Sequence, residues 1–221
     1  IPYGVTEPFF RPSTTSGPER WDKLLHVAQF APFKAPEVVA AVFTRLLKER
    51  PAIQAGWVCD RRHHPDVLRM FAPDLRSRLR LHAWADQPAL ASLYDEYGLF
   101  LFPSHYEGFG KTPCEAMARG LAVVATNVGG MADLIRSGEN GYLCPPGDVD
   151  GLHRRLAQLL DAPALAARLG DQARRDMAEM TWTNHARRLV EFALRRTVEK
   201  RQLRSANSGN FNKTSLINRQ S

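Results

Sequence analysis

The segment from 103 to 115 holds the residue types best suited to chemistry in this sequence. It reads Pro-Ser-His-Tyr-Glu-Gly-Phe-Gly-Lys-Thr-Pro-Cys-Glu. Gly108 and Gly110 allow the backbone to come close to a ligand, and Lys111 adds a positive charge beside them. The segment leads into a predicted helix, whose free N-terminal amides and dipole attract phosphate. These features together predict the binding of a phosphorylated ligand.

The two acids of this segment have different interpretations. Glu107 precedes the predicted helix, where a carboxylate beside a phosphate is unfavourable unless it has a task. Accepting hydrogen bonds from sugar hydroxyls is one such task, and the alternative is a solvated loop residue. Glu115 follows Thr112 and Pro113 in the pattern of a helix capping box. Its role could therefore be purely structural.

Short apolar runs alternate with helical patterns on both sides of this segment. Runs of this continuous apolar kind are typical of a parallel sheet that is covered on both faces. We therefore predict a doubly wound, Rossmann-like α/β domain, in which ligands bind beyond the carboxyl ends of the strands. The predicted strands cover 24–28, 53–58, 79–83, 99–102, 122–125 and 142–144. The predicted helices cover 35–49, 88–97, 113–119, 131–136, 148–160, 163–180 and 184–200.

Composition and charge narrow the class of protein. The hydrophobic fraction of 44% and the charged fraction of 24% are those of a globular protein. The net charge of +7 lies entirely at the C-terminal end, because residues 1–183 carry as many acids as bases. A nucleic-acid-binding domain would carry its bases on the folded surface, so nucleic acid is not an expected partner. Three scattered cysteines predict a reducing compartment, hence the cytoplasm, and no disulfide framework.

The chain divides into three predicted parts. Residues 1–22 are rich in Pro, Ser, Thr and Gly, which is typical of a linker. Residues 23–200 form the predicted folded domain. Residues 201–221 are basic, polar and without periodicity, and are expected to form a disordered tail. Because the sequence begins Ile-Pro-Tyr-Gly, without Met, we interpret it as a fragment of a longer chain.

The residues around the chemical segment resemble the donor-binding domain of the family 4 glycosyltransferases, which have the GT-B fold and transfer sugar with retention. Glu107 and Glu115 match the E-x7-E motif of that family. The likeness covers roughly residues 1–200 and includes an inter-domain linker at 1–12. Further landmarks are Lys34, Phe102-Pro103-Ser104, Val123-Val124-Ala125, Gly129-Gly130, Gly138-x-x-Gly141, Pro146-Gly147-Asp148 and Trp182.

This resemblance implies roles for the motif residues. Glu107, as the catalytic residue, would hold hydroxyls of the donor sugar, and Glu115 would hold the ribose. The diphosphate would lie against Lys34 and the amides that follow Gly108. No metal ion is expected, because cations and helix amides can stabilise the departing diphosphate. The donor-binding set implied by the resemblance is Lys34, Gly108, Phe109, Gly110, Lys111 and Glu115.

The resemblance also implies the substrates. The donor would be a nucleoside-diphosphate sugar, with UDP expected before GDP, and the acceptor a glycan or lipid-linked glycan. The acceptor would be bound by an N-terminal domain that this sequence does not contain. We therefore expect the chain alone to bind nucleotide without turnover. The alternatives are a non-catalytic nucleotide-sugar-binding module, or an epimerase or phosphorylase on a similar scaffold. Dinucleotide binding is disfavoured, since Pro113 replaces the third glycine of that fingerprint.

Two positions depart from the resembled pattern. Gln29 stands five residues before Lys34, where the family has Arg, and a glutamine cannot neutralise a diphosphate. Either Lys111 replaces the missing charge or donor binding is weakened. Trp84 follows the third strand, where the family tends to have Gly. It could lie near the nucleobase, but we expect it to be a core residue.

Three other features have milder interpretations. Cys59, His63 and His64 lack the spacing of a zinc site and are expected to lie in a solvated loop. His105 could touch the ligand or be a passive loop residue. The helix at 184–200 has one apolar face and paired arginines, and we expect it to pack on protein. The alternative is a peripheral contact with the inner face of the membrane.

Overall fold

The computed structural model describes residues 4–12 and 17–217, the part from 201 onward as backbone alone. Its centre is a six-stranded, fully parallel sheet in the order β3-β2-β1-β4-β5-β6. The predicted doubly wound sheet is therefore confirmed, and each predicted strand is present within two residues of its expected bounds. The strands are β1 Lys23–Val27, β2 Gln54–Val58, β3 Leu79–His82, β4 Leu99–Phe102, β5 Ala122–Thr126 and β6 Tyr142–Cys144.

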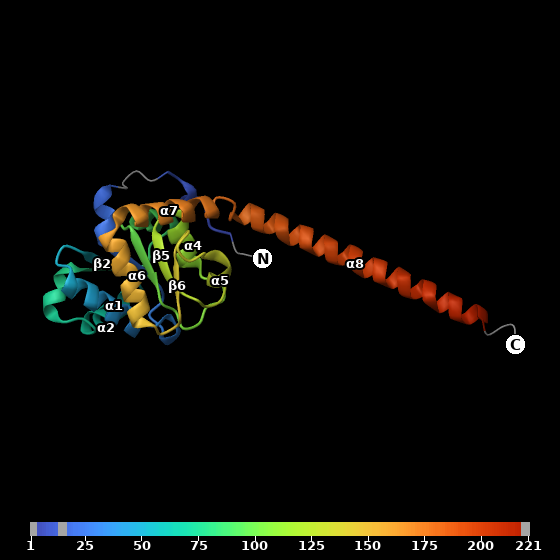
Figure 1. Cartoon of the computed structure of the whole chain (residues 1–221), viewed down its shortest axis with the longest axis horizontal. Helices are drawn as coiled ribbons and strands as arrows, with labels where there is room; N and C mark the ends of the chain where they lie inside the picture. The colour runs from blue at the N-terminus through green and yellow to red at the C-terminus, as the bar shows by residue number, and fades with distance from the viewer. Residues whose placement is uncertain (1–3, 13–16, 218–221) are drawn as a thin grey trace.

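Helices cover both faces of this sheet (Figure 1). The short helix α2 was not expected, because one and a half turns are too short to show a periodicity. The α-helices are α1 Pro36–Glu49, α2 His64–Arg69, α3 Gln87–Asp95, α4 Lys111–Ala118, α5 Met131–Leu134, α6 Val149–Asp161, α7 Pro163–Met177 and α8 Trp182–Ile217. Short 3-10 helices are η1 Glu7–Phe10, η2 Pro18–Asp22, η3 Pro32–Lys34, η4 Arg61–His63 and η5 Pro73–Arg78.

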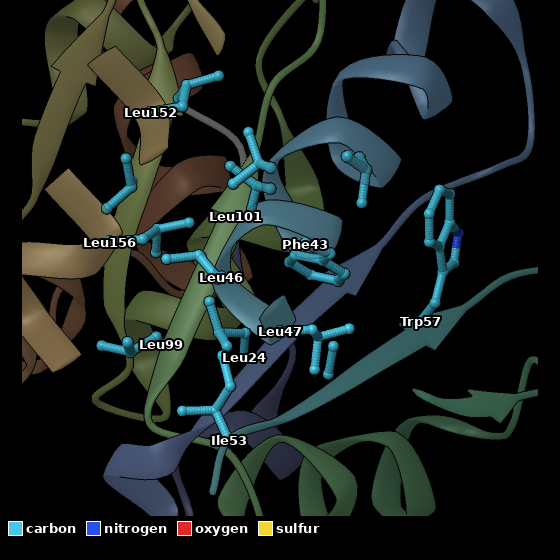
Figure 2. Close-up of a cluster of buried hydrophobic side chains, with 14 of the residues drawn as sticks. Leu24, Phe43, Leu46, Leu47, Ile53, Trp57, Leu99, Leu101, Leu152 and Leu156 are labelled. Atoms are coloured by element: carbon cyan, nitrogen blue, oxygen red, sulfur yellow. The ribbon is translucent and has the colours of Figure 1, made fainter. Parts of the chain in front are cut away.

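Two apolar cores lie on opposite faces of the sheet because successive strand residues point to opposite sides. Leu24 and Leu99 face α1 and α6, whereas Leu25 and Phe100 face α3 and α4. Figure 2 shows the first core, where Phe43 of α1 lies with leucines of α1, α6 and the strands. The apolar face predicted for α1 is buried as expected, at Val38, Val39, Val42, Phe43, Leu46 and Leu47.

The direction of the chain crossovers reverses between β1 and β4. From β1 the sheet grows outward through β2 and β3, and from β4 it grows the other way through β5 and β6. The connections leaving these two central strands therefore diverge to opposite faces and leave a crevice beyond their carboxyl ends. The segments that enter this crevice are those following Val27 and Phe102.

The N-terminal segment packs against α3 and against the short connection between α7 and α8 at one edge of the domain. The amide of Val5 donates to the carbonyl of Met180 at 2.6 Å, and Phe9 is buried with its ring edge against Tyr94. From there α8 projects away from the body of the domain (Figure 1). Within the described part of the chain, no helix is both long and apolar enough to cross a membrane.

The last helix differs from expectation in its length. The sequence predicts a helix ending near 200 and a disordered tail over 201–221, but α8 continues to Ile217. No proline follows Pro163, and a helix that is already nucleated extends at little cost through residues that can adopt helical dihedrals. Residues 218–221 lie outside the described residues. The division into linker, domain and tail stays a prediction.

Candidate functional site

A cavity of about 660 Å³ lies at the crevice between β1 and β4. Its wall combines the end of β1, the turn before α1, the loop after β4, the start of α4, one residue from the segment after β3 and the first residue of α8. This is the position at which a doubly wound sheet binds ligands. The lining residues are Val27, Ala28, Gln29, Phe33, Lys34, Trp84, Glu107, Gly108, Phe109, Gly110, Lys111, Thr112 and Trp182.

Lys34 and Glu107 meet on the wall of this cavity. Lys34 ends η3, and Ala35 follows in the left-handed region with a φ of 53°, which turns the chain into α1. The Lys34 ammonium contacts Oε2 of Glu107. It also lies 5.2 Å from the ring centre of Phe102 and 5.3 Å from that of Phe33. The Lys34 and Glu107 side chains are only 15% and 16% exposed, so the pair is shielded but still open to the cavity.

The loop that carries Glu107 is braced by two glycines from another part of the chain. The amide of Gly130 donates to the carbonyl of Gly108 at 3.0 Å. Gly129 has a φ of 51°, and a Cβ there would lie 2.1 Å from the Glu107 carbonyl oxygen. The site therefore depends on a close backbone approach that only glycine permits. From the sequence, these two glycines were noted only as landmarks of the resembled family. The close backbone contact that requires them was not predicted.

The start of α4 presents its first turn to the cavity. Gly110 precedes the helix with a φ of 85°, and α4 begins at Lys111 instead of the expected Pro113. Thr112 therefore lies inside the first turn and is not the N-cap, so the predicted capping box with Glu115 is wrong. A left-handed glycine ends the loop earlier than the proline suggested. Gly110, Lys111 and Thr112 all line the cavity, which places early helix amides beside it.

Glu115 is not brought to the cavity wall with Glu107. Its side chain is buried and accepts a hydrogen bond from the Tyr94 hydroxyl at 3.3 Å. Burial raises the pKa of the Glu115 carboxyl, against the opposing influence of Lys111 and of the Tyr94 bond. Glu115 lines a narrow pocket of about 10 Å³ together with Phe109 and Lys111, which also line the large cavity. The two carboxylates thus line different spaces.

Two tryptophans form part of the cavity wall. Trp84 is 42% exposed, so its expected place in the core is wrong. It follows the edge strand β3, beyond the last paired residue His82, where the sheet no longer covers it. Trp182 reaches the cavity from the first residue of α8. Neither residue was assigned to the site by sequence, because an isolated tryptophan is more often buried than ligand-facing.

Of the other polar residues near the site, two line the cavity and one does not. Gln29 lines the cavity, as does Lys111. His105 lies within 3.0 Å of Glu37, at the start of α1, and is not among the cavity-lining residues.

His63 and His64 lie in the short helices η4 and α2, and Cys59 is buried between β2 and η4, instead of forming the expected solvated loop. His63 bonds to Asp66 at 3.1 Å and stacks on Phe30, and His64 lies 3.2 Å from the His82 carbonyl. Burial raises the pKa of the Cys59 thiol to about 11. Among the described residues, no three His, Cys, Asp or Glu side chains gather as a metal site would require.

Comparison with known proteins places the chain in a family. Residues 15–176 match the family described as glycosyl transferases group 1. The chain belongs to this family. A relative of this group 1 domain is a D-inositol 3-phosphate glycosyltransferase of Thermobispora bispora, 33% identical over 76% of the chain and 42% of the relative. Another is a glycogen synthase of Mycobacterium tuberculosis, 29% identical over 79% of the chain and 42% of the relative. The chain therefore spans less than half the length of these relatives.

The fold of this chain is also similar to that of a solved structure. The sucrose-phosphate synthase of Thermosynechococcus elongatus matches with a TM-score of 0.72 and 27% identity. The match covers 93% of this chain and 52% of that protein. The expected assignment of the domain to one half of a GT-B architecture is thereby confirmed.

Proposed function

We propose that this chain is the donor-binding half of a family 4 retaining glycosyltransferase, which transfers sugar from a nucleoside-diphosphate sugar to a glycan or lipid-linked glycan. The supporting observation is the cavity at the sheet's switch point, where Lys34, Glu107 and the first turn of α4 converge. UDP is the expected nucleotide, ahead of GDP. The full enzyme would bind its acceptor through an N-terminal domain outside this chain.

The chemistry proposed for this cavity depends on charge that develops during transfer. As the bond from sugar to diphosphate breaks, negative charge grows on the departing phosphate oxygens. The Lys34 ammonium and the early amides of α4 are held in place before reaction, so they stabilise that charge without rearranging solvent. These groups supply positive charge without a metal ion. Glu107 would accept hydrogen bonds from donor-sugar hydroxyls.

The role proposed for Glu115 is a contact with the ribose. Its carboxyl lines a narrow pocket that shares Phe109 and Lys111 with the large cavity. A ribose that contacts Glu115 would therefore lie close to these two side chains. Ribose binding at Glu115 predicts that Glu115→Gln weakens nucleoside diphosphate binding more than it weakens binding of inorganic pyrophosphate, because only the nucleotide carries a ribose.

A second candidate function is a non-catalytic nucleotide-sugar-binding module. Gln29 favours it, because this residue lines the cavity where the resembled family has an arginine. In this case nucleotide would bind, but the chain joined to its acceptor domain would not transfer sugar.

Calorimetry with UDP, GDP and ADP tests the proposed function. We expect one of the three to bind, and failure of all three would contradict both candidate functions. Lys34→Ala should weaken binding about 10- to 100-fold, the value of a charge-assisted hydrogen bond. Lys111→Ala tests whether Lys111 replaces the missing arginine, and an unchanged affinity would reject that replacement.

We also propose that α8 makes a peripheral contact with a membrane surface. Large apolar side chains are exposed along it at Leu189, Val190, Phe192, Leu194 and Val198. Arginines lie between them in the sequence, and a basic amphipathic helix binds anionic lipid surfaces. Salt-sensitive co-sedimentation with anionic vesicles, lost on deletion of 184–221, would support contact with an anionic membrane surface. Co-sedimentation that survives this deletion would contradict it.

A further inference from the structure

The Lys34–Glu107 ion pair occupies the two groups that the proposed function assigns to different parts of the donor. Lys34 is the cation for the diphosphate, and Glu107 is the acceptor for sugar hydroxyls. In this structure each is the other's partner, since the ammonium contacts Oε2 of Glu107. The other carboxylate oxygen accepts from the Gly108 amide at 3.1 Å. Both oxygens of Glu107 are therefore engaged within the protein.

We propose that donor binding proceeds by an exchange of partners at this pair. The diphosphate takes over the Lys34 ammonium, and the loss of that contact frees Oε2 of Glu107 for a sugar hydroxyl. This inference rests on the proposed function. Its consequence is a coupling between the two halves of the donor, because the phosphate contact makes the sugar-binding acceptor available.

The surroundings of Lys34 make such an exchange physically reasonable. The ammonium lies over the rings of Phe102 and Phe33, at 5.2 Å and 5.3 Å from their centres. The faces of these two rings attract the ammonium whether it contacts Glu107 or a phosphate. They therefore hold Lys34 at the cavity wall before and after the exchange. Glu107 forms a single ion-pair contact and is not clamped by a second cation among the described residues. A pair with one contact is easier to replace than a bidentate one.

The coupling predicts that Glu107 opposes the binding of free nucleoside diphosphate. Without a sugar, the diphosphate must break the pair, and Glu107 gains no hydroxyl in return. Glu107→Gln should therefore raise the affinity for UDP, or for whichever of UDP, GDP and ADP binds, about three- to tenfold, since partly exposed pairs are worth about 1 kcal/mol. Glu37→Gln is the matched control, because it removes a nearby carboxylate that contacts His105 instead of Lys34, and should leave the affinity unchanged.

A double-mutant cycle separates exchange from simple repulsion between Glu107 and the phosphates. If Glu107 acts by holding Lys34, Glu107→Gln has no effect on affinity in a Lys34→Gln background. If Glu107 merely repels the diphosphate, the same gain appears in both backgrounds, and the exchange is overturned. NMR titration can measure the weaker binding expected of the Lys34→Gln variants, so that affinities of all four proteins enter the cycle.

A crystal structure of the chain with the bound nucleoside diphosphate gives the second measurement. We expect the Lys34 ammonium on a phosphate oxygen and the Glu107 carboxylate no longer within hydrogen-bond distance of it. Bound nucleotide with the Lys34–Glu107 contact intact would overturn the exchange alone. Failure of wild-type protein to bind any of the three nucleotides would overturn the proposed function and the exchange with it.

Discussion

Helix α4 has an ion pair near each end, and the two pairs differ in how completely they are enclosed. At its start, Lys34 and Glu107 share one contact beside a cavity. At its end, Arg119 binds both carboxylate oxygens of Asp95, with side chains only 5% and 4% exposed. Arg119 also donates to the carbonyls of Phe9 and Arg11.

The difference indicates which pair is structural and which is available for chemistry. The Arg119–Asp95 pair is bonded through both carboxylate oxygens and ties the N-terminal segment to α3 and α4, so a ligand would have to replace several contacts at once. The Lys34–Glu107 pair has one replaceable contact and faces a space large enough for a ligand. Enclosure and the number of contacts therefore distinguish the two pairs more clearly than charge does.

Removing one partner of the enclosed pair should have the largest effect. Asp95→Asn leaves a buried guanidinium without its counter-charge, which costs about 3–5 kcal/mol of unfolding free energy. Glu107→Gln at the open pair should cost less than about 1 kcal/mol, because that pair is only partly buried. Urea denaturation of the two variants measures both values. Equal losses would show that the pairs do not differ in the way we describe.

A buried histidine in β1, the strand beneath the cavity, should make the free energy of unfolding depend on pH. His26 of β1 is buried, with Nδ1 donating to the Leu101 carbonyl at 3.0 Å, and burial lowers its pKa to about 4 from 6.5. The unfolded chain therefore takes up this proton at higher pH than the folded chain. Protonation of His26 in the unfolded chain should therefore lower the free energy of unfolding by about 3 kcal/mol as pH falls from about 6.5 to about 4. Above pH 6.5 this residue should have no effect on stability.

The variant His26→Asn tests this origin of the pH dependence. Asparagine keeps a donor near Nδ1 but does not titrate, so its unfolding free energy should vary less over this pH window. Denaturant unfolding at several pH values measures the slope. An undiminished slope would assign the pH dependence to other groups.

The loop that carries Glu107 should be sensitive to a single methyl group added at Gly129. Gly129→Ala places a Cβ against the Glu107 carbonyl in a left-handed backbone, and should cost about 2 kcal/mol of stability and lower nucleotide affinity. Gly138→Ala is the matched control, because its φ of 87° is also left-handed but a Cβ meets nothing within 4 Å. It should cost about 1 kcal/mol and leave affinity unchanged. Equal effects on affinity would argue against the bracing of this loop.

Substitution of Trp84 in the cavity wall should give the smallest change in stability. Trp84→Ala removes a partly exposed side chain, so the unfolding free energy should change by less than about 1 kcal/mol. If the nucleobase stacks on this ring, affinity should fall about three- to tenfold. Calorimetry and thermal unfolding measure the two effects. An unchanged affinity would remove Trp84 from the site.

Local sequence patterns predicted the frame of the molecule because its strands and helices obey periodic rules. The continuous apolar strands and the apolar face of α1 predicted the buried parallel sheet, and the loop after Phe102 could be placed at its ligand-binding edge. The errors lie where local signals competed or were too weak to show. Pro113 suggested a later start for α4 than Gly110 produced, and α2 was too short for any period to appear.

What the sequence determined by itself is therefore the sheet, its covering helices and the loop most suited to bind a phosphorylated ligand. Only the tertiary structure decided which charged groups meet there. Lys34 and Glu107 are 73 residues apart in the chain and contact each other, whereas Glu107 and Glu115 are neighbours in a motif and face different spaces. The reason is physical. Periodicity reports which face of an element is buried, but contacts between loops depend on how the crossovers bring strand ends together.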